Sequence, residues 1–475
     1  MPFPPTQSPL ARALAERAYV DPTPVQLAVL QPEAASRDLL VSAQTGSGKT
    51  VAFGLALGAQ LLGEAPTLGA PGAPQALIVA PTRELALQVQ RELDWLYAHA
   101  RARVAACVGG MDPRREARVL GEGAHIVVGT PGRLRDHLER GRLDVSRLQA
   151  VVLDEADEML DLGFREDLEF ILDATPETRR TLMFSATLPR PIVALARKYQ
   201  KDALRLEIAG GEAGHADIQY RAVRVEPGEI GLAVVNVLRH ADAPAALVFC
   251  NTREAVRHLQ AMLQERGFSV VALSGELSQD ERNRALQALR DGRARVCVAT
   301  DVAARGIDLP NLSLVVHADL PRDAEALQHR SGRTGRAGRK GVSVLLIPFA
   351  RRRKAVRLMV ESQALPLWSG PPTAEEIRAL DQERLLRHPA LTEPGSEEDL
   401  ALARALLAER SPEDVAVALA RFYREQLPAA EDVGDPAETR RERPRHVPLE
   451  DSRERTQERA ADNPRRRPPA PRLAD

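Results

Sequence analysis

Two short runs of this sequence carry the residue types that nucleotide chemistry requires. The first is a glycine-rich loop that ends in Gly48-Lys49-Thr50, and the second, much later in the chain, is the acidic run 154–157. The backbone N–H groups of such a loop can surround a polyphosphate at the start of a helix, where the lysine reaches the β- and γ-phosphates and the threonine hydroxyl holds magnesium. The loop residues that we expect to bind nucleotide are Ala43, Gln44, Thr45, Gly46, Ser47, Gly48, Lys49 and Thr50.

The position of the acidic run favours a catalytic role over a solvated loop. Asp154 and Glu155 come directly after the apolar residues 151–153, which are typical of a buried strand. A carboxylate at the end of such a strand, downstream of a phosphate loop, is placed to bind magnesium, and the next acid could polarise an attacking water. We therefore predict Thr50 and Asp154 as magnesium ligands, and Lys49, Asp154 and Glu155 as catalytic residues.

The sequence around these runs alternates as α/β proteins do. Short apolar runs bounded by turn or polar residues alternate with helical patterns, first up to residue 207 and again from 218. Apolar runs without polar alternation are typical of parallel strands covered by helices on both faces. The apolar density falls around Gly210-Gly211, which predicts a flexible linker. The expected divisions are a first domain at 1–207, a linker at 208–217, a second domain at 218–365, a helical segment at 372–428 and a disordered tail at 429–475.

Composition limits the classes of protein to which the chain can belong. Hydrophobic residues make up 44% and charged residues 28%, which fits a soluble globular protein. No apolar stretch approaches the roughly 20 residues that span a bilayer, and the first residues lack the features of a signal peptide, so we expect a cytoplasmic protein without a membrane partner. Cys107, Cys250 and Cys297 have no metal-ligand spacing and are expected to be buried. Because the net charge is −1, nucleic-acid binding must use local basic surfaces.

The chain after residue 371 has helix signals but little apolar material. The run 411–414 offers an N-cap, a proline and acids, and Val415, Leu419 and Phe422 then recur at helical spacing. Three short helices make a small core for an independent module, so they must pack on the second domain or on another copy of the chain. From residue 429 the richness in Pro, Arg and acids predicts disorder, and the basic end is either a solvated tail or a weak, sequence-independent phosphate binder.

The ordered set of motifs resembles the DEAD-box family of ATP-dependent RNA helicases. The motifs that carry the resemblance are 22–26, 43–50, 81–85, 109–110, 130–133, 154–157, 185–187, 248–253, 279–282, 299–301, 304–308 and 329–336. They extend over roughly residues 3 to 350, in the family's order. The resemblance implies an α/β fold of two tandem RecA-like domains that form a cleft, with ATP and Mg²⁺ as cofactors and RNA as the partner.

The resemblance also implies roles for single residues. Gln26 would read the adenine edge, because a side-chain amide can donate and accept a hydrogen bond at the same time. Tyr19 would lie near the adenine, and Asp308 would contact the ribose. Arg333 and Arg336 would complete the catalytic set by placing positive charge on the γ-phosphate. The residues that would couple hydrolysis to unwinding are Asp157, Ser185, Thr187 and His329. The implied RNA contacts are Pro81, Thr82, Arg83, Gly109, Gly110, Thr130, Gly132, Arg133, Arg253, Gln279, Arg282 and Thr300.

These residues favour an RNA-stimulated ATPase that unwinds short RNA duplexes locally. Small polar groups, backbone amides and single arginines suit the phosphate backbone of single-stranded RNA or a short duplex, so we expect little sequence preference. No aromatic stacking platform is evident in a chain with 3% aromatic residues. The alternative is an ATP-gated RNA clamp or annealing protein without productive unwinding, against which intact Glu155, Thr187 and Arg333 count. A translocating helicase for long duplexes or DNA is disfavoured by the motifs at 22–26 and 154–157 together.

Two positions in the last motif depart from the common family pattern. Leu327 stands where many members have tyrosine and Ser331 where many have isoleucine, and neither change removes a charge. This form is similar to that of the bacterial heat-resistant RNA-dependent ATPase of the family. Residues 371–377 also resemble the start of that protein's dimerisation segment, so we expect a homodimer. We do not expect that relative's further RNA-binding module from the Arg- and Pro-rich end of this sequence.

Overall fold

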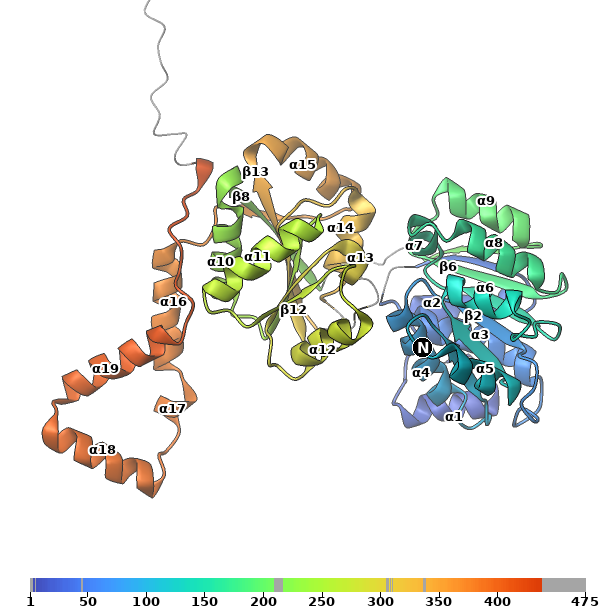
Figure 1. The fold of residues 1–475 in the computed structure, drawn as a ribbon, viewed down its shortest axis with the longest axis horizontal. Coiled ribbons are helices and arrows are strands. Elements are labelled where there is room, and N and C mark those ends of the chain that lie inside the picture. The colour runs from blue at the N-terminus through green and yellow to red at the C-terminus, as the bar shows by residue number, and fades with distance from the viewer. Residues whose placement is uncertain are drawn as a thin grey trace, which may run out of the picture.

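The computed structural model describes residues 3–4, 6–43, 46–208, 217–304, 307, 309, 311–335 and 339–437. Four residues of the expected ATP site, Gln44, Thr45, Asp308 and Arg336, therefore lie outside the described residues. The same is true of 209–216 in the expected linker and of 438–475 in the expected tail. The described residues form two α/β domains and a smaller helical segment (Figure 1).

In the described residues, the first domain is built on a parallel sheet of seven strands in the order β3-β4-β2-β5-β6-β1-β7. This confirms the predicted α/β fold with a parallel sheet. The strands are β1 (Leu39–Ser42), β2 (Ala76–Val79), β3 (Val104–Cys107), β4 (Ile126–Gly129), β5 (Ala150–Leu153), β6 (Arg180–Ser185) and β7 (Leu204–Glu207). The helices are α1 (Ser8–Glu16), α2 (Pro24–Val29), α3 (Lys49–Leu62), α4 (Arg83–Leu96), α5 (Pro113–Gly121), α6 (Pro131–Glu139), α7 (Ala156–Asp161), α8 (Arg165–Ala174) and α9 (Arg190–Tyr199).

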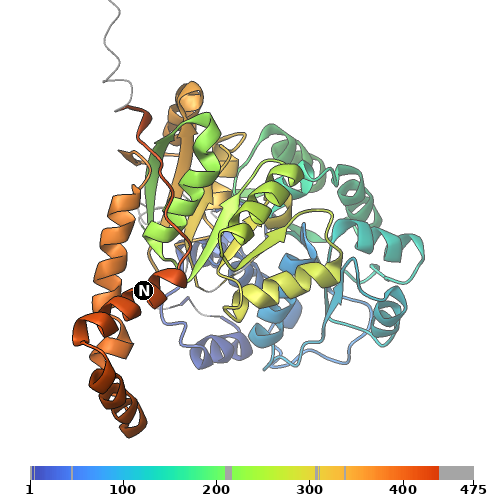
Figure 2. The same ribbon diagram turned by 60° about the vertical axis from the view of Figure 1, so that its left-hand side comes forward.

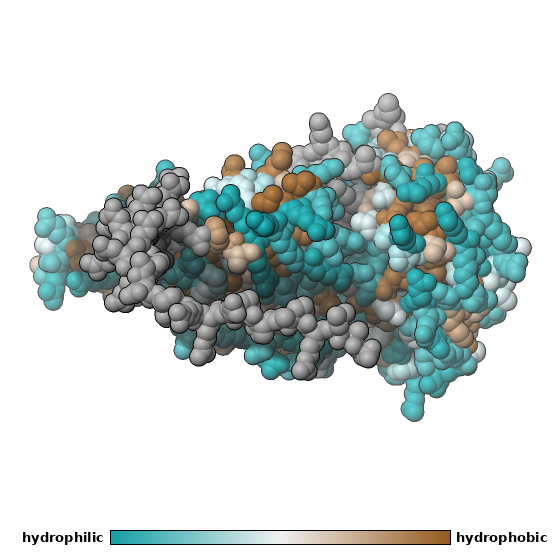
Figure 3. All heavy atoms as spheres, turned by 90° about the horizontal axis from the view of Figure 1, so that it is seen from above, coloured by the Kyte–Doolittle hydropathy of each residue, from teal (hydrophilic) through white to brown (hydrophobic). Residues whose placement is uncertain are grey.

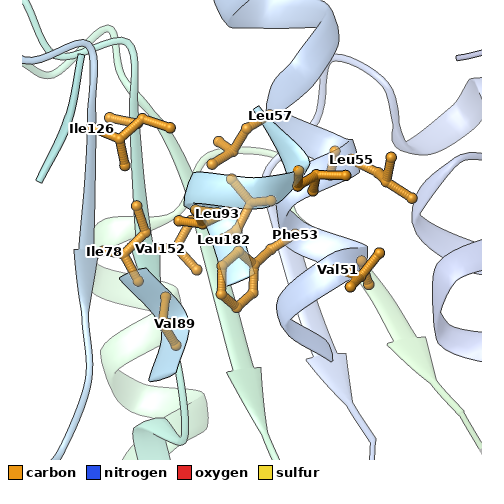
Figure 4. Close-up of a cluster of buried hydrophobic side chains, with 14 of the residues drawn as sticks. Val51, Phe53, Leu55, Leu57, Ile78, Val89, Leu93, Ile126, Val152 and Leu182 are labelled. Carbon is orange, nitrogen blue, oxygen red and sulfur yellow. The ribbon is translucent and has the colours of Figure 1, made fainter. Parts of the chain in front are cut away.

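Two apolar cores, one on each face of this sheet, hold the first domain together. On one face, Phe53 of α3 and Leu93 of α4 pack over Ile78 and Val152 of the central strands (Figure 4). On the other face, Leu77, the neighbour of Ile78, packs with residues of α8 and α9. Each buried side chain of this size contributes about 1.5–3 kcal/mol relative to an exposed one. The two-sided packing fixes the carboxyl ends of the strands, where the loops of the candidate site begin.

The second domain repeats this architecture, with the described strands in the order β10-β11-β9-β12-β13-β8-β14. The strands are all parallel: β8 (Ile218–Val225), β9 (Ala245–Phe249), β10 (Val270–Leu273), β11 (Val296–Ala299), β12 (Leu312–His317), β13 (Gly341–Pro348) and β14 (Leu367–Ser369). The helices are α10 (Ile230–Ala241), α11 (Arg253–Glu265), α12 (Gln279–Arg290), α13 (Asp301–Ala304), α14 (Ala324–Ser331) and α15 (Arg352–Glu361). Strands β10 and β14 lie at opposite edges of the sheet, so surfaces next to them are well separated.

The helical segment contacts the second domain through its first helix. Helix α16 (Ala374–Leu386) packs along α10, where Asp381 forms an ion pair of 2.7 Å with the buried Arg239. Helices α17 (Pro389–Thr392), α18 (Glu397–Glu409) and α19 (Pro412–Glu425) project away from the domain (Figures 1 and 2). None of the residues of these three helices is buried. Their exposed large apolar side chains include Leu402, Leu406 and Phe422.

The chain returns to the second domain over residues 428–437, which we call the C-terminal strap. The Asn236 side chain in α10 exchanges two hydrogen bonds of 2.8 Å with the Glu431 backbone. Val433 is 2% exposed and packs in the core of the second domain, and Asp435 accepts two hydrogen bonds from Arg224 of β8. We expected disorder from residue 429. The structure differs over 429–437 because these few apolar and acidic groups find matching partners on α10 and β8.

The surface and the cysteines agree with the expectations from composition. Hydrophilic residues with scattered apolar patches cover the face seen from above (Figure 3). Among the described residues, no helix combines the length and apolarity that crossing a membrane requires. Cys107, Cys250 and Cys297 are buried, and burial raises the pKa of each thiol to about 12. The three thiols are therefore packing groups rather than reactive ones.

Candidate functional site

The phosphate-loop residues connect the end of β1 to the start of α3. Gly46 and Gly48 have positive φ angles of 84° and 87°, which glycine adopts without strain. Lys49 is the first residue of α3 and is buried, and its Nζ donates a hydrogen bond of 3.1 Å to the Ala43 carbonyl. The ammonium group is thus held over the loop at the positive end of the helix dipole, an arrangement that attracts phosphate.

Gln26 lies directly against this loop. Its amide oxygen accepts a hydrogen bond of 2.9 Å from the Thr23 N–H, and its amide nitrogen donates one of 3.4 Å to the Gly48 carbonyl. A Cβ atom at Gly48 would lie 2.7 Å from that nitrogen, so the contact also requires glycine. Each end of the amide makes one of these internal bonds, which leaves one N–H donor and one oxygen lone pair with which Gln26 can read adenine. Tyr19, the expected adenine neighbour, stacks on Trp95 with ring centroids 5.6 Å apart.

The acidic run follows β5 and faces Lys49. Burial raises the pKa of Asp154; the charge of Lys49 opposes this rise and that of Glu155 adds to it. Burial also opposes ionisation of Glu155, but a hydrogen bond with Glu158 and the charges of Lys49 and Arg333 lower its pKa overall. Glu155 has a φ of 51°, a left-handed conformation that is rare outside glycine and clusters at functional sites. The two neighbouring acids are therefore placed in different electrostatic environments.

Two oxygen atoms at this position have unused hydrogen-bonding capacity. Asp154 Oδ1 and Ser47 Oγ are buried and have no hydrogen-bond partner within the described part of the chain. Both oxygen atoms can therefore accept a further partner. Carboxylate and hydroxyl oxygens are the donors that Mg²⁺ accepts, and a cation here would also relieve the repulsion between Asp154 and Glu155. The residues present thus fit a magnesium ion.

Asp157 connects the acidic run to the motif at 185–187 and faces the second domain. The Thr187 N–H donates a hydrogen bond of 2.9 Å to Asp157 Oδ2, and the Asp157 N–H donates one of 3.3 Å to Ser185 Oγ. Thr187 Oγ1 also lies 3.0 Å from Oε1 of Glu325 in α14. Side-chain atoms of Asp157, Glu325 and His329 all lie within 4.8 Å of one another. The expected coupling residues therefore meet at the boundary between the domains.

Arg333 and His329 bring the second domain to the acidic run. Arg333 is buried, and its guanidinium donates hydrogen bonds of 3.3 and 3.4 Å to the carbonyls of His329 and Ile307. Burial lowers the pKa of His329, although the charges of Asp157 and Glu155 oppose the shift. A hollow of about 830 Å³ lies between the domains; its walls include Asp161 and Leu162 of the first domain and Thr300, Glu325, His329 and Arg333 of the second. The expected cleft is therefore present.

Expected RNA-contact residues from the two domains meet beside this cleft. A Cβ atom at Gly110 would lie 2.7 Å from Arg83 Nη1 and 3.6 Å from Gln279 Cγ. Arg282 forms an ion pair of 2.7 Å with Glu84, and Gln279 Nε2 lies 3.3 Å from the same carboxylate oxygen. The motifs at 81–85 and 109–110 thus contact the motif at 279–282. Together they form a polar face that crosses from one domain to the other.

The remaining expected RNA contacts also follow strand ends. Thr82 and Thr130 are the N-caps of α4 and α6, directly after β2 and β4, and Thr300 follows β11. Arg253 begins α11 after β9 and is exposed, and Arg133 donates a hydrogen bond of 3.3 Å to the Met111 carbonyl. The carboxyl ends of parallel strands meet at one edge of a sheet, which is where open α/β sheets bind ligands. Pro81 lies in the connection between β2 and α4, and Gly132 is the second residue of α6, directly after its N-cap Thr130 and Pro131.

Both α/β domains match known helicases. Residues 23–195 match the family model "DEAD/DEAH box helicase", and residues 231–338 match "Helicase conserved C-terminal domain". DEAD-box ATP-dependent RNA helicase 53 of Oryza sativa subsp. japonica is 41% identical over 355 residues, which are 74% of this chain and 58% of that protein. The DEAD-box ATP-dependent RNA helicase CshA of Bacillus licheniformis is 39% identical over 340 residues, 72% of this chain and 69% of that protein. The chain belongs to the DEAD-box family.

A solved structure extends the likeness of this DEAD-box chain to three dimensions. The structure of S. cerevisiae Dbp5 bound to RNA and ADP BeF3 superposes with a TM-score of 0.68 at 25% sequence identity. The match covers 80% of this chain and 97% of the other. The present chain spans 58% to 63% of the length of several of the curated relatives that it matches.

Sequence reasoning missed four of the residues that join the two domains of this DEAD-box chain, namely Glu84, Asp161, Arg322 and Glu325. Glu84 accepts a hydrogen bond from Arg282. Glu325 contacts Thr187, and Arg322 forms an ion pair with Asp161. Glu84 lies inside the motif at 81–85, which is the one signal that could have indicated it. The others occur in polar stretches whose partners are far away in the sequence.

Arg330, in the motif at 329–336, has a structural role in the DEAD-box fold. It is 2% exposed, donates hydrogen bonds of 2.5 and 2.7 Å to Asp301 and lies 5.0 Å from the centroid of the Phe249 ring. It therefore ties three motifs of the second domain together. Of the two departures from the family pattern, Leu327 is buried in the core and Ser331 Oγ lies 2.9 Å from Ser343 Oγ. Both departures affect packing.

Proposed function

We propose that this chain is an ATP-dependent RNA helicase, an RNA-stimulated ATPase that unwinds short RNA duplexes locally. The observation that carries the proposal is geometric: side-chain atoms of Asp157, in the acidic run of the first domain, and of His329, in the second, lie within 4.8 Å of one another. The catalytic groups are therefore complete only while the domains are together. An enzyme with this arrangement can make ATP hydrolysis depend on whatever holds the domains closed.

Different side chains have different roles in phosphoryl transfer. Lys49 and the loop around it hold the β- and γ-phosphates, and the ionised Glu155 is placed to orient and polarise the attacking water. Arg333, and by family resemblance Arg336, supply positive charge to the transferred phosphoryl group, an effect worth about 10³- to 10⁵-fold in other NTPases. Thr50 and Asp154 would hold Mg²⁺, which when bound neutralises charge on the phosphate oxygens.

RNA is the group that we expect to close the cleft. The polar face beside the cleft draws on both domains, so an RNA strand bound there contacts both at once and stabilises their closed arrangement. The similar structure of S. cerevisiae Dbp5 is bound to RNA and ADP BeF3, which supports RNA as the partner. Contacts through single arginines, helix N-caps and glycine backbone favour the sugar–phosphate chain over base edges, which predicts little sequence preference.

The test compares two site variants with an exposed control. Lys49→Ala should remove ATP binding or hydrolysis, whereas Glu155→Gln should bind ATP and RNA but hydrolyse at least about 100-fold more slowly. Lys201→Ala, on the exposed surface, should match the unaltered chain. The measurements are RNA-stimulated ATP turnover and separation of a labelled short duplex. Full turnover in Lys49→Ala would refute the phosphate-loop assignment, and turnover without strand separation in the unaltered chain would favour the ATP-gated clamp.

We also propose a cytoplasmic homodimer joined through the projecting helices. Helices α18 and α19 expose Leu402, Leu406 and Phe422, and none of their residues is buried. In a dimer with two-fold symmetry, each copy would cover the apolar surface of the other by the same contacts. Two-fold symmetry is the commonest symmetry of soluble oligomers. The absence of metal-ligand spacing and the burial of the three cysteines suit the reducing cytoplasm.

A further inference from the structure

A strongly basic segment lies on the second domain away from the cleft. The sequence from 349 to 357 reads Phe-Ala-Arg-Arg-Arg-Lys-Ala-Val-Arg, and its cations at 351–354 are all exposed. Within the described residues, none of these four cations takes part in an ion pair, whereas Arg357 pairs with Glu361. Four adjacent unpaired cations are a strong local charge in a chain whose net charge is −1.

The position of these cations is unfavourable for the protein alone. The first turn of α15 consists of Arg352, Arg353 and Lys354 and contains no acidic residue. The N-cap residue, Arg351, makes no side-chain capping hydrogen bond. The N-terminal end of a helix carries partial positive charge and unsatisfied N–H groups, so cations there repel the helix dipole. An anionic ligand bound here would be attracted both by the helix dipole and by the cationic side chains, and it would offset the repulsion between them.

Two exposed aromatic rings adjoin the cations. Phe349 is 48% exposed and Trp368, on the edge strand β14, is 37% exposed. The guanidinium of Arg352 lies 5.6 Å from the centroid of the Trp368 ring. Phe349, Arg352 and Trp368 line one small, partly open hollow with mainly apolar walls. Exposed rings beside a planar cation are the elements with which proteins stack single-stranded bases.

The C-terminal strap also forms part of the wall of this hollow. Pro436 and Ala437 of the C-terminal strap line the hollow, and Asp435 holds the strap in place through two hydrogen bonds from Arg224. A Cβ atom at Gly370 would lie 2.7 Å from Asp435 Cβ, so the strap packs closely on the chain next to β14. The hollow is thus formed by four separate segments of the chain, from β8, from the junction of β13 and α15, from β14 and from the strap.

We propose that this region is a second binding site for single-stranded RNA. Bases would stack on Trp368 and Phe349, and Arg351, Arg353 and Lys354 would contact the phosphates. We call these five residues, with Arg352, the α15 patch. RNA is favoured over an acidic peptide because the patch combines unpaired cations with flat exposed rings, and only a nucleic acid offers both phosphates and flat bases. The proposal concerns RNA binding alone and can hold or fail independently of helicase activity.

The α15 patch is separate from the polar face beside the cleft. That face uses residues after β9, β10 and β11, whereas the patch lies at β14, the opposite edge of the sheet. At about 4.8 Å between neighbouring strands, the two surfaces are on the order of 20–30 Å apart. In Figure 1 they correspond to α15 at the top of the second domain and α12 at the bottom. One strand or one structured RNA could therefore be anchored at the patch while another part is unwound.

The first test uses the fluorescence of Trp368. The chain has two tryptophans, so Trp95→Phe leaves Trp368 as the single reporter. Adding single-stranded oligouridine without nucleotide should quench its emission, because stacked bases quench indole. The quench should persist when Lys49→Ala is added, which separates this proposal from the proposed function. No quench by RNA, or a quench by polyglutamate instead of RNA, would overturn the proposal, and the second result would point to an acidic protein partner.

The second test measures binding of labelled single-stranded RNA at several salt concentrations. Replacing Arg351, Arg353 and Lys354 together by serine should lower the salt slope of log K by about 2, since each lost phosphate contact on a single strand removes about 0.7. The control replaces Arg142, Arg147 and Lys201, which are exposed at the amino ends of strands in the first domain, by serine. Trp368→Ala should weaken binding at least about fivefold. Equal slopes in the two triple variants would refute the proposal.

Discussion

Thr187 of the first domain and Glu325 of the second lie 3.0 Å apart, from Oγ1 to Oε1. This contact joins the motif at 185–187 to α14, the helix that also carries His329. Burial, with the nearby charge of Asp157, raises the pKa of Glu325 from 4.5 to about 7. When the domains separate, Glu325 is exposed to water and its pKa returns toward the ordinary value. The contact between the domains is therefore sensitive to pH.

The sign of this dependence follows from linkage. A carboxyl group whose pKa is higher in the closed form stabilises that form below its ordinary pKa, and this contribution is lost as pH rises through about 7. We expect closure without nucleotide to weaken between pH 6 and 8 more in the unaltered chain than in Glu325→Gln, which stays neutral. The lowered pKa of the neighbouring His329 acts in the opposite sense in both proteins, so the difference between the two profiles reports on Glu325. Energy transfer between dyes on the two domains measures closure, and the buried native cysteines leave introduced surface cysteines free for labelling. Equal pH profiles for both proteins would contradict the role of Glu325.

Glu84 should control how far the domains close without RNA. It accepts hydrogen bonds of 2.7 Å from Arg282 and 3.3 Å from Gln279. We expect both of these residues to contact RNA. Glu84→Gln weakens this cross-domain contact, so ATP turnover without RNA should fall several-fold, while turnover at saturating RNA should change little because RNA then bridges the domains. Glu64→Gln, at an exposed position of the first domain, is the control. If RNA-free turnover is unchanged, the contact does not contribute to closure.

The sheets and the phosphate loop could be predicted because their signals are local. Strands buried on both faces are continuous apolar runs, as at 151–153, and a glycine-rich turn that ends in Lys49 and Thr50 has few other uses. The contacts between domains could not be predicted in this way. Thr187 and Glu325 are separated by 138 positions and Glu84 and Arg282 by 198, and no local sequence signal pairs one with the other.

The C-terminal strap and the α15 patch also could not be predicted from composition. Residues 429–437 are acidic and poor in large apolar groups, and their order depends on partners such as Asn236 and Arg224 that lie some two hundred positions earlier. The sequence offers no evident stacking platform because Phe349 and Trp368 stand apart in the chain and meet only when β14 joins the sheet. Low aromatic content limits how many platforms a protein can have, but it does not exclude one.

The C-terminal strap should stabilise the second domain. Val433 is 2% exposed, so Val433→Ala removes two buried methyl groups and should lower the free energy of unfolding by about 1–2 kcal/mol. Val360, 71% exposed on α15, provides the control Val360→Ala, for which we expect little change. Urea unfolding followed by circular dichroism measures both. If the two variants are equally stable, residues 429–437 do not pack in solution as they do here.

The dimer hypothesis can be tested without removing any chain. Deleting 372–428 would also expose Arg239, which pairs with Asp381 of α16, so a loss of dimer could then reflect damage to the second domain. Leu406 and Phe422 are 45% and 65% exposed, and Leu406→Asp with Phe422→Asp should leave each protomer folded. Two charges would then face the partner's apolar surface without compensation, so we expect a monomer in sedimentation velocity. Leu365→Asp, at a leucine that is 90% exposed outside the projecting helices, should stay dimeric. A full-length chain that sediments as a monomer at every concentration would end the hypothesis.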